Sequence, residues 1–300
     1  MKNIIGKIYL MLGFSLAGTS VVTGSILTEK LNESMIILSH PCFCHYLFSK
    51  NQLVCTNGQA EVLLFSACCS SEGSHKQEEV MIIFDKDIEK VYPGTKMGVL
   101  IVRGISEQEG CKKEDEATFL KQLRDKYEGV TKKELKEQRP VNAYAAYYKK
   151  FGQSYHLLSQ LDSMLKGKKT CESKSLLLQS MFFNELESMM LTAGHDLNSL
   201  EPPLMLNLAT GNEGYQSISG RDVTTAAGDL ILCDNARVIS SILKGPDYDT
   251  RITPDTRNVL FTIYAPPGIS THEVRTALMK LEERIRAFAP DSKTEMLEVL

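Results

Sequence analysis

From Met81 onward, the spacing of apolar residues changes from strand-like to helical and then back to strand-like. Two short runs rich in Ile and Val, residues 81–84 and 97–102, flank Tyr92-Pro93-Gly94 and predict two strands around a turn. The middle of the chain has apolar residues at helical spacing. Helices are expected at residues 114–127, 131–139, 143–151, 154–165 and 173–192, with Gly129, Gly152, Gly167 and Gly194 just past four of their ends.

The last third of the chain returns to short apolar runs punctuated by Gly, Asn, Asp and Pro, as in mixed or antiparallel sheets. These runs are residues 204–209, 228–233, 238–242 and 259–264. Capping boxes at Thr131 and Ser270 predict helix starts, and an apolar stripe from Val274 to Phe288 predicts a helix that finishes the chain. The expected fold class is therefore α+β, with layered mixed β-sheets packed with helices in a single main domain.

Composition adds little beyond an ordinary globular protein. The chain has 300 residues, of which 43% are hydrophobic and 24% charged, and its net charge is −3. Near-neutral charge gives no global electrostatic reason to expect a nucleic-acid partner. Any RNA contact has to come from local clusters, and the candidates are Lys149-Lys150 and Lys166-Gly167-Lys168-Lys169, which solvation alone also explains.

The cysteines are unevenly distributed, with five of the eight in the first 80 residues. The segment His40-Pro41-Cys42-Phe43-Cys44-His45 suggests zinc, but its C-x-C spacing lacks the two- to four-residue spacer of structural zinc sites. No phosphate-binding glycine loop or nucleophile elbow is present either. We therefore expect no metal and no cofactor, and scattered thiols are typical of a reducing, cytoplasmic compartment.

The first 80 residues admit three interpretations. Lys2, Lys7 and the apolar run 8–17 outline a signal peptide, although the run is too short to span a bilayer. The segment is alternatively a genuine extension. The interpretation we favour is a wrong start, because Gln77-Glu78-Glu79 is what a purine-rich ribosome-binding sequence ahead of the Met81 codon would spell if translated. The expected domains are then a poorly defined extension, 1–80, and a functional domain, 81–300.

Residues 184–267 carry several short polar motifs in a particular order. They are Asn184-Glu185-Leu186, Gly194-His195-Asp196-Leu197, Ala209-Thr210-Gly211-Asn212-Glu213, Ala227-Gly228-Asp229, Gly245-Pro246-Asp247, Thr250-Arg251-Ile252-Thr253 and Asn258-Val259-Leu260-Phe261. Taken together, these motifs resemble the B3/B4 domain of the phenylalanyl-tRNA synthetase β subunit in its freestanding form. The resemblance covers roughly residues 81–267. It implies layered sheets and helices, and a module that clears tyrosine wrongly esterified to phenylalanine tRNA.

The resemblance also implies a set of site residues. It points to His195 and Asn184, and the polar turns 211–214 and 245–251 add further candidates. Catalytic roles are expected for His195, Asp247 and Asp249, and substrate-binding roles for Asn184, Glu213, Thr250, Arg251 and Asn258. An aminoacyl ester is already activated, so such a site needs only to position water and to stabilise the oxyanion. A buried carboxylate or imidazole would select a substrate hydroxyl, because without that hydroxyl the group stays unpaired.

Each candidate also has a plain structural interpretation. His195 is expected at the turn after the helix that ends at Thr192, where it either contacts substrate or caps the helix. Glu213 is either a ligand or a solvated hairpin tip. Arg251 either holds an RNA phosphate or pairs with an aspartate at the surface. Asn184, in the middle of a helix, favours a satisfied buried contact over substrate binding.

Three functions remain open at this point. The first is hydrolysis of a mischarged aminoacyl-tRNA ester in trans, with weak tRNA binding through local basic patches. The second is a non-catalytic RNA-binding module, and the third is a protein that binds an aromatic amino acid. Ligase activity is rejected, because the chain has no ATP motif and no room for an adenylation domain. The substrate amino acid and the oligomeric state stay open.

Overall fold

The computed structural model describes residues 81–106, 116–168, 170 and 175–300 in full, together with the backbone of four strands before them. The chain divides into two compact units, Met1–Ile83 and Phe84–Leu300. The first unit contains consecutive antiparallel strands, which are β1 (Ile36–His40), β2 (Cys44–Ser49), β3 (Gln52–Cys55) and β4 (Ala60–Leu63). Cys42, Gln77 and Lys169 lie outside the described residues, so the structure does not bear on the expectations that rest on them.

The second unit contains a four-stranded antiparallel sheet in the order β15-β6-β14-β7. Its strands are β6 (Lys96–Arg103), β7 (Thr192–Asp196), β14 (Val259–Ala265) and β15 (Lys293–Val299). All seven residues of β14 are buried, because the strand is central and both of its faces are covered. This strand therefore forms the centre of the core, and β7 lies directly beside it.

Further strands of this unit form antiparallel pairings of their own. Strands β8 (Leu204–Leu208), β11 (Leu230–Cys233), β12 (Val238–Ser241) and β13 (Gly245–Pro246) pair in that order. A hairpin joins β9 (Gly214–Gln216) and β10 (Asp222–Thr224). Strand β5 (Ile82–Asp85) spans the boundary between the units.

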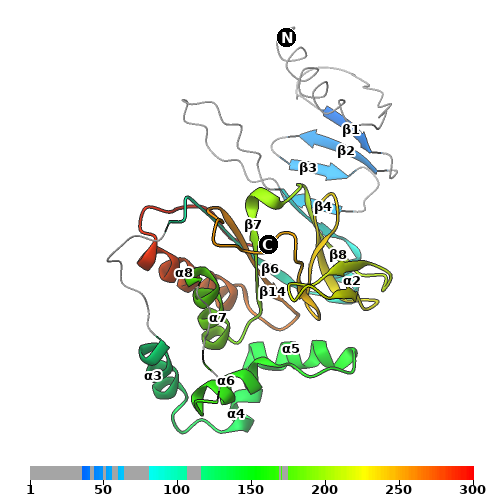
Figure 1. Ribbon diagram of the computed structural model, residues 1–300. Helices are drawn as coiled ribbons and strands as arrows, with labels where there is room; N and C mark the ends of the chain where they lie inside the picture. Colours follow the sequence, from blue (N-terminus) through cyan, green and yellow to red (C-terminus); the bar gives the residue numbers. More distant parts are fainter. Residues whose placement is uncertain are drawn as a thin grey trace. The chain divides into compact units, whose positions relative to one another are not determined.

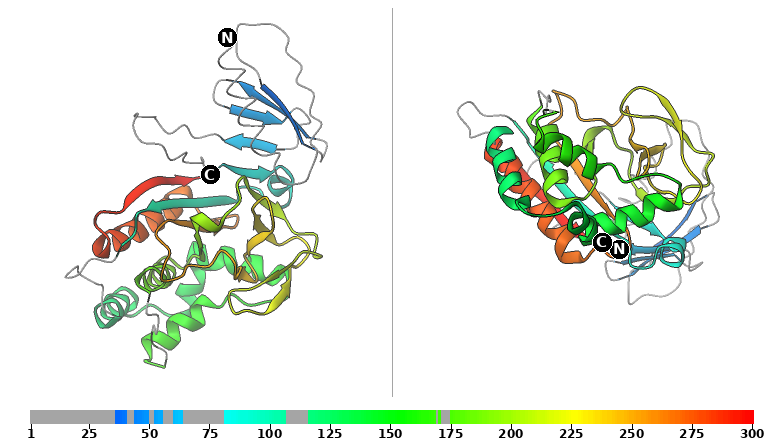
Figure 2. Two further views of the ribbon diagram at one scale, coloured as in Figure 1. Left: turned by 45° about the horizontal axis from the view of Figure 1, so that its top comes forward. Right: turned by 90° about the horizontal axis from the view of Figure 1, so that it is seen from below.

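The helices of the second unit include two long ones that cover one face of the four-stranded sheet (Figures 1 and 2). These are α7 (Leu176–Ser188) and α8 (Thr271–Phe288). The others are α2 (Asp87–Val91), α3 (Glu116–Tyr127), α4 (Lys132–Glu137), α5 (Arg139–Lys150), α6 (Leu157–Leu165) and the 3-10 turn η2 (Leu197–Ser199). A Cβ on Gly98 of β6 would lie 2.6 Å from Val274 of α8, so glycine permits this close approach.

Helix α5 is attached to the sheets by tyrosine hydroxyls. Tyr147 donates to the buried carboxylate of Asp229 at 2.6 Å, and Tyr148 donates to the carbonyl of Ile242 at 2.9 Å. Tyr144 donates to the carbonyl of Tyr264 in β14. Buried tyrosines need such partners, and three of them on one helix fix its orientation on the strands.

The expected α+β class with several sheets packed against helices is confirmed. Both predicted capping boxes form, at Thr131 and at Ser270. Some local expectations are wrong. Helix α7 ends at Ser188 with Met189 in the left-handed region, and Gly194 lies inside strand β7. The chain ends in strand β15 rather than a helix, and α2 lies between the first two expected strands.

Within the described part of the chain, no helix is long and apolar enough to cross a membrane.

Candidate functional site

His195 lies in strand β7 and not, as expected, in a turn after a helix. Its partner in β14 is Leu260, and a single β-bridge links it to Arg251 on its other side. Its side chain is 0% exposed. The expected helix-capping role is therefore wrong, because His195 lies inside a strand and its buried ring bonds to the hydroxyl of Thr250 and not to helix-end carbonyls.

The turn that follows β13 supplies the partners of His195. Asp247 is buried, and its Oδ2 accepts the backbone N–H groups of Asp249 at 3.0 Å and Thr250 at 3.1 Å. Its Oδ1 accepts the hydroxyl of Thr250. Gly245, at the start of β13 just ahead of the turn, has a φ of +80°, a conformation that a side chain rarely allows. Three donors of the turn thus hold the Asp247 carboxylate inside the fold.

His195, Thr250 and Asp247 form a buried chain of hydrogen bonds. The distance between His195 Nδ1 and Thr250 Oγ1 is 2.7 Å, and that between His195 Nδ1 and Asp247 Oδ1 is 3.8 Å. A carboxylate only accepts hydrogen bonds, so the single hydroxyl proton of Thr250 is directed to Asp247. His195 must then donate from Nδ1 to Thr250. This leaves the lone pair of Nε2 as an acceptor.

Nε2 of His195 is itself buried and has no hydrogen-bond partner among the described residues. The hydroxyl of Thr262 in β14 is also buried; it has no hydrogen bond of regular geometry among the described residues, although it interacts with the Tyr264 hydroxyl and lowers the pKa of that group. Thr262 pairs with Ala193 and lies two residues from Leu260, so it shares a sheet face with His195 at a diagonal position. Unsatisfied buried polar atoms are rare in native proteins. On this face, Nε2 of His195 therefore has no partner within the described chain.

Burial determines the charge states in this cluster. It lowers the pKa of His195 to about 4, against a smaller opposing effect of the Asp234 carboxylate. Burial also raises the pKa of Asp247, although the hydrogen bonds from Thr250 and Asp249 oppose this. His195 is consequently neutral at physiological pH. Its Nε2 is therefore suited to accept a hydrogen bond from water or from a substrate hydroxyl. It is poorly suited to act as a proton donor, because it is not protonated at that pH.

Asp249 and Arg251, from the same turn, point elsewhere. Asp249 forms a 2.5 Å ion pair with Arg237, and the side chain of Asp249 is 58% exposed. The guanidinium of Arg251 lies 3.6 Å from the centre of the Tyr248 ring, and its Nη1 donates to the Tyr248 carbonyl at 2.6 Å. The surface Asp–Arg pair considered from the sequence therefore exists, with Arg237 in place of Arg251.

Glu213 organises its own loop. Its carboxylate accepts the N–H and hydroxyl of Thr210 at 2.8 and 2.7 Å, and the hydroxyl of Thr225 at 2.6 Å. Burial alone would raise the pKa of Glu213, but the hydrogen bonds from Thr225 and Thr210 outweigh it and lower the pKa to about 2. Glu213 is partly exposed, so it lies in a solvated loop ahead of β9 and also holds that loop together through its carboxylate.

The two asparagines lie away from the cluster. Asn258 accepts the N–H of Gly104 and donates to Asn198, both at 3.1 Å, and so joins loop segments. Asn184 is 0% exposed, and among the described residues neither atom of its amide has a hydrogen-bond partner, so the expected satisfied contact is not seen within that part of the chain. Its helix, α7, contacts the Gly194 side of β7. Neighbouring strand residues face opposite sides, so the sheet separates Asn184 from His195.

Thr262 is the residue that inspection of the sequence overlooked. Its signal was present, because a threonine interrupts an otherwise apolar run that is long enough for a central strand. No group of three or more His, Cys, Asp or Glu side chains within the described residues is arranged to bind a metal ion.

Comparison with known proteins gives a limited result. No protein-family model matches the chain, and neither does any curated protein. Among solved structures, one that resembles it is an N-terminal fragment of the phenylalanyl-tRNA synthetase β subunit from Pyrococcus horikoshii, with a TM-score of 0.39 and 15% sequence identity. The similarity covers 75% of this chain and 52% of that one, so the chain spans about half of the fragment. This is a weak structural resemblance.

Proposed function

We propose that the chain hydrolyses an aminoacyl ester carried by tRNA, with His195 positioning the attacking water. The observation that carries this proposal is the acceptor atom Nε2 of His195, which is buried, has no partner among the described residues, and is held in one tautomer by Thr250 and Asp247. Preorganised polar groups in a water-poor site are the main source of rate enhancement in acyl transfer. The order of polar motifs from residue 184 to residue 267 supports the substrate class.

The pKa of His195 limits its role. At about 4, it is roughly three units below physiological pH, where an efficient general base has a pKa close to the working pH. In the proposal, His195 therefore orients water, or accepts a substrate hydroxyl, and takes up a proton only as the transition state develops. An activated ester tolerates such a weak base. Because Nε2 is enclosed, the proposal requires a local opening around it for substrate to enter.

The enclosed geometry also favours a second function, which is binding of an amino acid without hydrolysis. An acceptor at His195 Nε2 and a hydroxyl at Thr262 on one sheet face match a ligand hydroxyl that both donates and accepts. A test therefore needs to measure hydrolysis and binding separately.

The tRNA contacts in this proposal are few. Lys150 lies 4.1 Å from the ring centre of Tyr92, and Lys166 pairs with Asp162 at 2.7 Å, so part of the lysine clusters is engaged within the fold. We expect affinity for tRNA to fall with salt on a shallow slope that reflects about two to four phosphate contacts. A slope near ten would indicate a basic surface assembled from other residues.

The experiment is a deacylation panel of mischarged tRNAs with two matched variants, Asp247→Asn and Asp249→Asn. Both aspartates lie in one turn, but only Asp247 bonds to Thr250. Asp247→Asn should slow hydrolysis by roughly ten- to a thousandfold, the range for a lost positioning group, while Asp249→Asn stays near wild type. Equal losses in both variants would contradict the proposed role of the buried chain. Binding of a free aromatic amino acid without any hydrolysis would support the second function instead.

A further inference from the structure

The sheet face that carries His195 also carries two hydroxyl groups from β14. In the register of β7 and β14, His195 lies opposite Leu260, and Ala193 lies opposite Thr262. Thr262 and Tyr264 therefore follow Leu260 on the same face, because alternate residues of a strand share a face. His195 and Thr262 are both 0% exposed, and Tyr264 is 3% exposed. An imidazole and two hydroxyls are thus enclosed on one face of the sheet.

The two hydroxyls belong to a chain that begins at Ser240 in β12. The hydroxyl of Tyr264 forms a hydrogen bond with that of Ser240, which is also buried. Burial raises the pKa of Tyr264, and the hydroxyls of Ser240 and Thr262 oppose this through their interactions with the phenol. The phenol therefore keeps its proton at physiological pH. It links the hydroxyl of Ser240 to that of Thr262.

Strand β12 anchors this hydroxyl chain and the turn beneath His195 together. Ser240 pairs with Pro246 in β13, and the N–H of Asp247, the next residue, donates to the carbonyl of Ile239 at 2.8 Å. The start of the hydroxyl chain and the carboxylate that supports His195 are therefore held by neighbouring strands. Both chains end on the same sheet face, one at an imidazole and the other at a threonine hydroxyl.

The ends of the two chains are complementary. Nε2 of His195 has only a lone pair, because Nδ1 donates to Thr250. The hydroxyls of Ser240, Tyr264 and Thr262 have one proton each, and the two links between them use two of these protons. When the links run from Ser240 to Tyr264 and from Tyr264 to Thr262, the remaining proton is on Thr262. The face then presents one acceptor and one donor.

The spacing of these two groups suits one small bridging molecule. His195 and Thr262 form a diagonal pair on neighbouring strands, whose Cβ atoms are about 7 Å apart, within reach of a long side chain. A water that donates to Nε2 of His195 and accepts from Oγ1 of Thr262 would satisfy both atoms. Buried waters in proteins typically occupy such positions. A water held in this way keeps a lone pair for attack on a carbonyl carbon.

We propose that His195 and Thr262 hold the attacking water between them, with Thr262 donating to its oxygen and His195 accepting one of its protons. Thr262 is then a second catalytic residue, and Ser240 and Tyr264 are positioning residues that act through it. The water oxygen bonds to the ester carbonyl carbon, the bond from that carbon to the ribose oxygen breaks, and the proton taken up by Nε2 passes to that oxygen. This role in hydrolysis rests on the function proposed above, whereas the water site itself does not.

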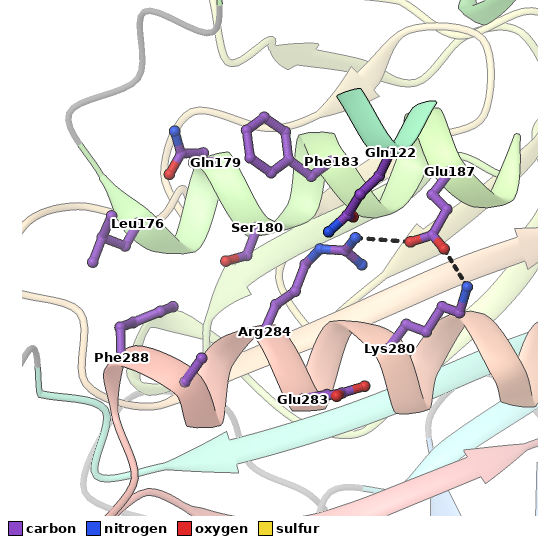
Figure 3. Close-up of a pocket in the computed structure, with 11 residues that line it drawn as sticks. Gln122, Leu176, Gln179, Ser180, Phe183, Glu187, Lys280, Glu283, Arg284 and Phe288 are labelled. Atoms are coloured by element: carbon purple, nitrogen blue, oxygen red, sulfur yellow. Dashed lines mark hydrogen bonds and ion pairs between the residues drawn. The ribbon is translucent and has the colours of Figure 1, made fainter. Parts of the chain in front are cut away.

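Thr192 provides a matched control on the opposite face of the sheet. It pairs with Ile263 in β14, and its Oγ1 is also buried without a partner among the described residues. That face is covered by α7 and α8, which Figure 3 shows side by side and joined through Glu187. Thr262→Val and Thr192→Val thus remove the same buried group from the two faces of one sheet.

The first measurement is single-turnover hydrolysis of the mischarged tRNA that wild type cleaves. Thr262→Val should slow hydrolysis by roughly ten- to a hundredfold, as expected when a positioned polar group is lost, without weakening tRNA binding. Thr262→Ser restores the hydroxyl and should stay near wild type, as should Thr192→Val. Tyr264→Phe should give an intermediate rate, because Thr262 keeps its hydroxyl and loses only the group that directs it. Cooperative urea unfolding of each variant shows that it is folded.

The second measurement does not depend on activity. The nitrogen NMR signal of His195 Nε2 reports whether the lone pair of that atom accepts a hydrogen bond. Wild type and Thr192→Val should show a bonded Nε2, and Thr262→Val should move the signal toward that of a free lone pair. This response in a wild type that hydrolyses no ester supports the water site and contradicts the proposed hydrolysis. The inference is overturned if Thr262→Val leaves the Nε2 signal unchanged, or if it hydrolyses the ester as fast as wild type does.

Discussion

Replacing Glu185 by Gln should change how the stability of the protein depends on pH. Glu185, on α7, accepts the N–H of Thr192 at 2.7 Å, and burial raises the pKa of its carboxyl to about 8, a shift that this hydrogen bond only partly offsets. The folded state therefore binds a proton that the unfolded state has released between about pH 4.5 and 8. Stability should fall as pH rises through that window, by up to about 1.4 kcal/mol per unit.

His195 has the opposite effect in a lower window. Burial lowers its pKa from 6.5 to about 4, so the unfolded state binds more protons there and stability falls as pH drops from 6.5 to 4. The two slopes largely cancel between pH 4.5 and 6.5. Of these two groups, only Glu185 contributes between pH 6.5 and 8, and the loss of stability that it causes there should reach at most about 2 kcal/mol. This is an upper limit, because the side chain of Glu185 keeps some exposure to solvent.

The assay is urea unfolding of wild type and Glu185→Gln at pH 5, 6, 7 and 8. The glutamine keeps an acceptor for Thr192, so the variant changes the charge and not the hydrogen bond. It should unfold with a free energy that is nearly constant from pH 6.5 to 8, and it should lose stability on the acid side, where the effect of His195 is no longer offset. Equal pH slopes in the two proteins above pH 6.5 would refute the reasoning.

Two further substitutions test the packing. Gly98→Ala should lower the free energy of unfolding by about 1–3 kcal/mol, because its Cβ would lie 2.6 Å from Val274 and 3.2 Å from Leu278. Gly214→Ala is the matched control, because the nearest atom to its Cβ would be the Val223 oxygen at 3.9 Å. Chemical unfolding of both variants measures the difference. Asn184→Leu should raise the free energy of unfolding by about 1 kcal/mol, since it removes two unpartnered buried polar atoms. A loss of stability in Asn184→Leu would instead show that ordered water satisfies the amide.

Local signals in the sequence predicted several elements well. The capping boxes at Thr131 and Ser270 depend on residues three apart, so they could be identified without the fold. The end of α7 could not, because Met189 is an unusual residue for the left-handed region and the strand 192–196 forms by pairing with the distant β14. Strand β15 was missed because a charged, bulged edge strand shows little alternation of apolar residues.

The candidate site was predicted in parts. His195 and the turn from Gly245 to Arg251 were both selected from the sequence. Nothing in the sequence shows that His195 and Thr250, which are 55 residues apart, form a hydrogen bond. Asp247 and Asp249 belong to the same short polar turn, and the sequence does not distinguish them. The backbone N–H groups of the turn bond to Asp247, and they direct its carboxylate inward. Long-range packing therefore determines which of the candidate residues form one cluster.

The most direct test of the central claim is the single-turnover hydrolysis of tyrosine esterified to phenylalanine tRNA, and of a panel of other mischarged tRNAs, by wild type and His195→Ala. Wild type should release at least one amino acid faster than buffer does. His195→Ala should slow that release by roughly ten- to a thousandfold while its unfolding stays cooperative. If wild type leaves every ester untouched, or if a folded His195→Ala hydrolyses it as fast as wild type, His195 is not the centre of an ester-hydrolysing site.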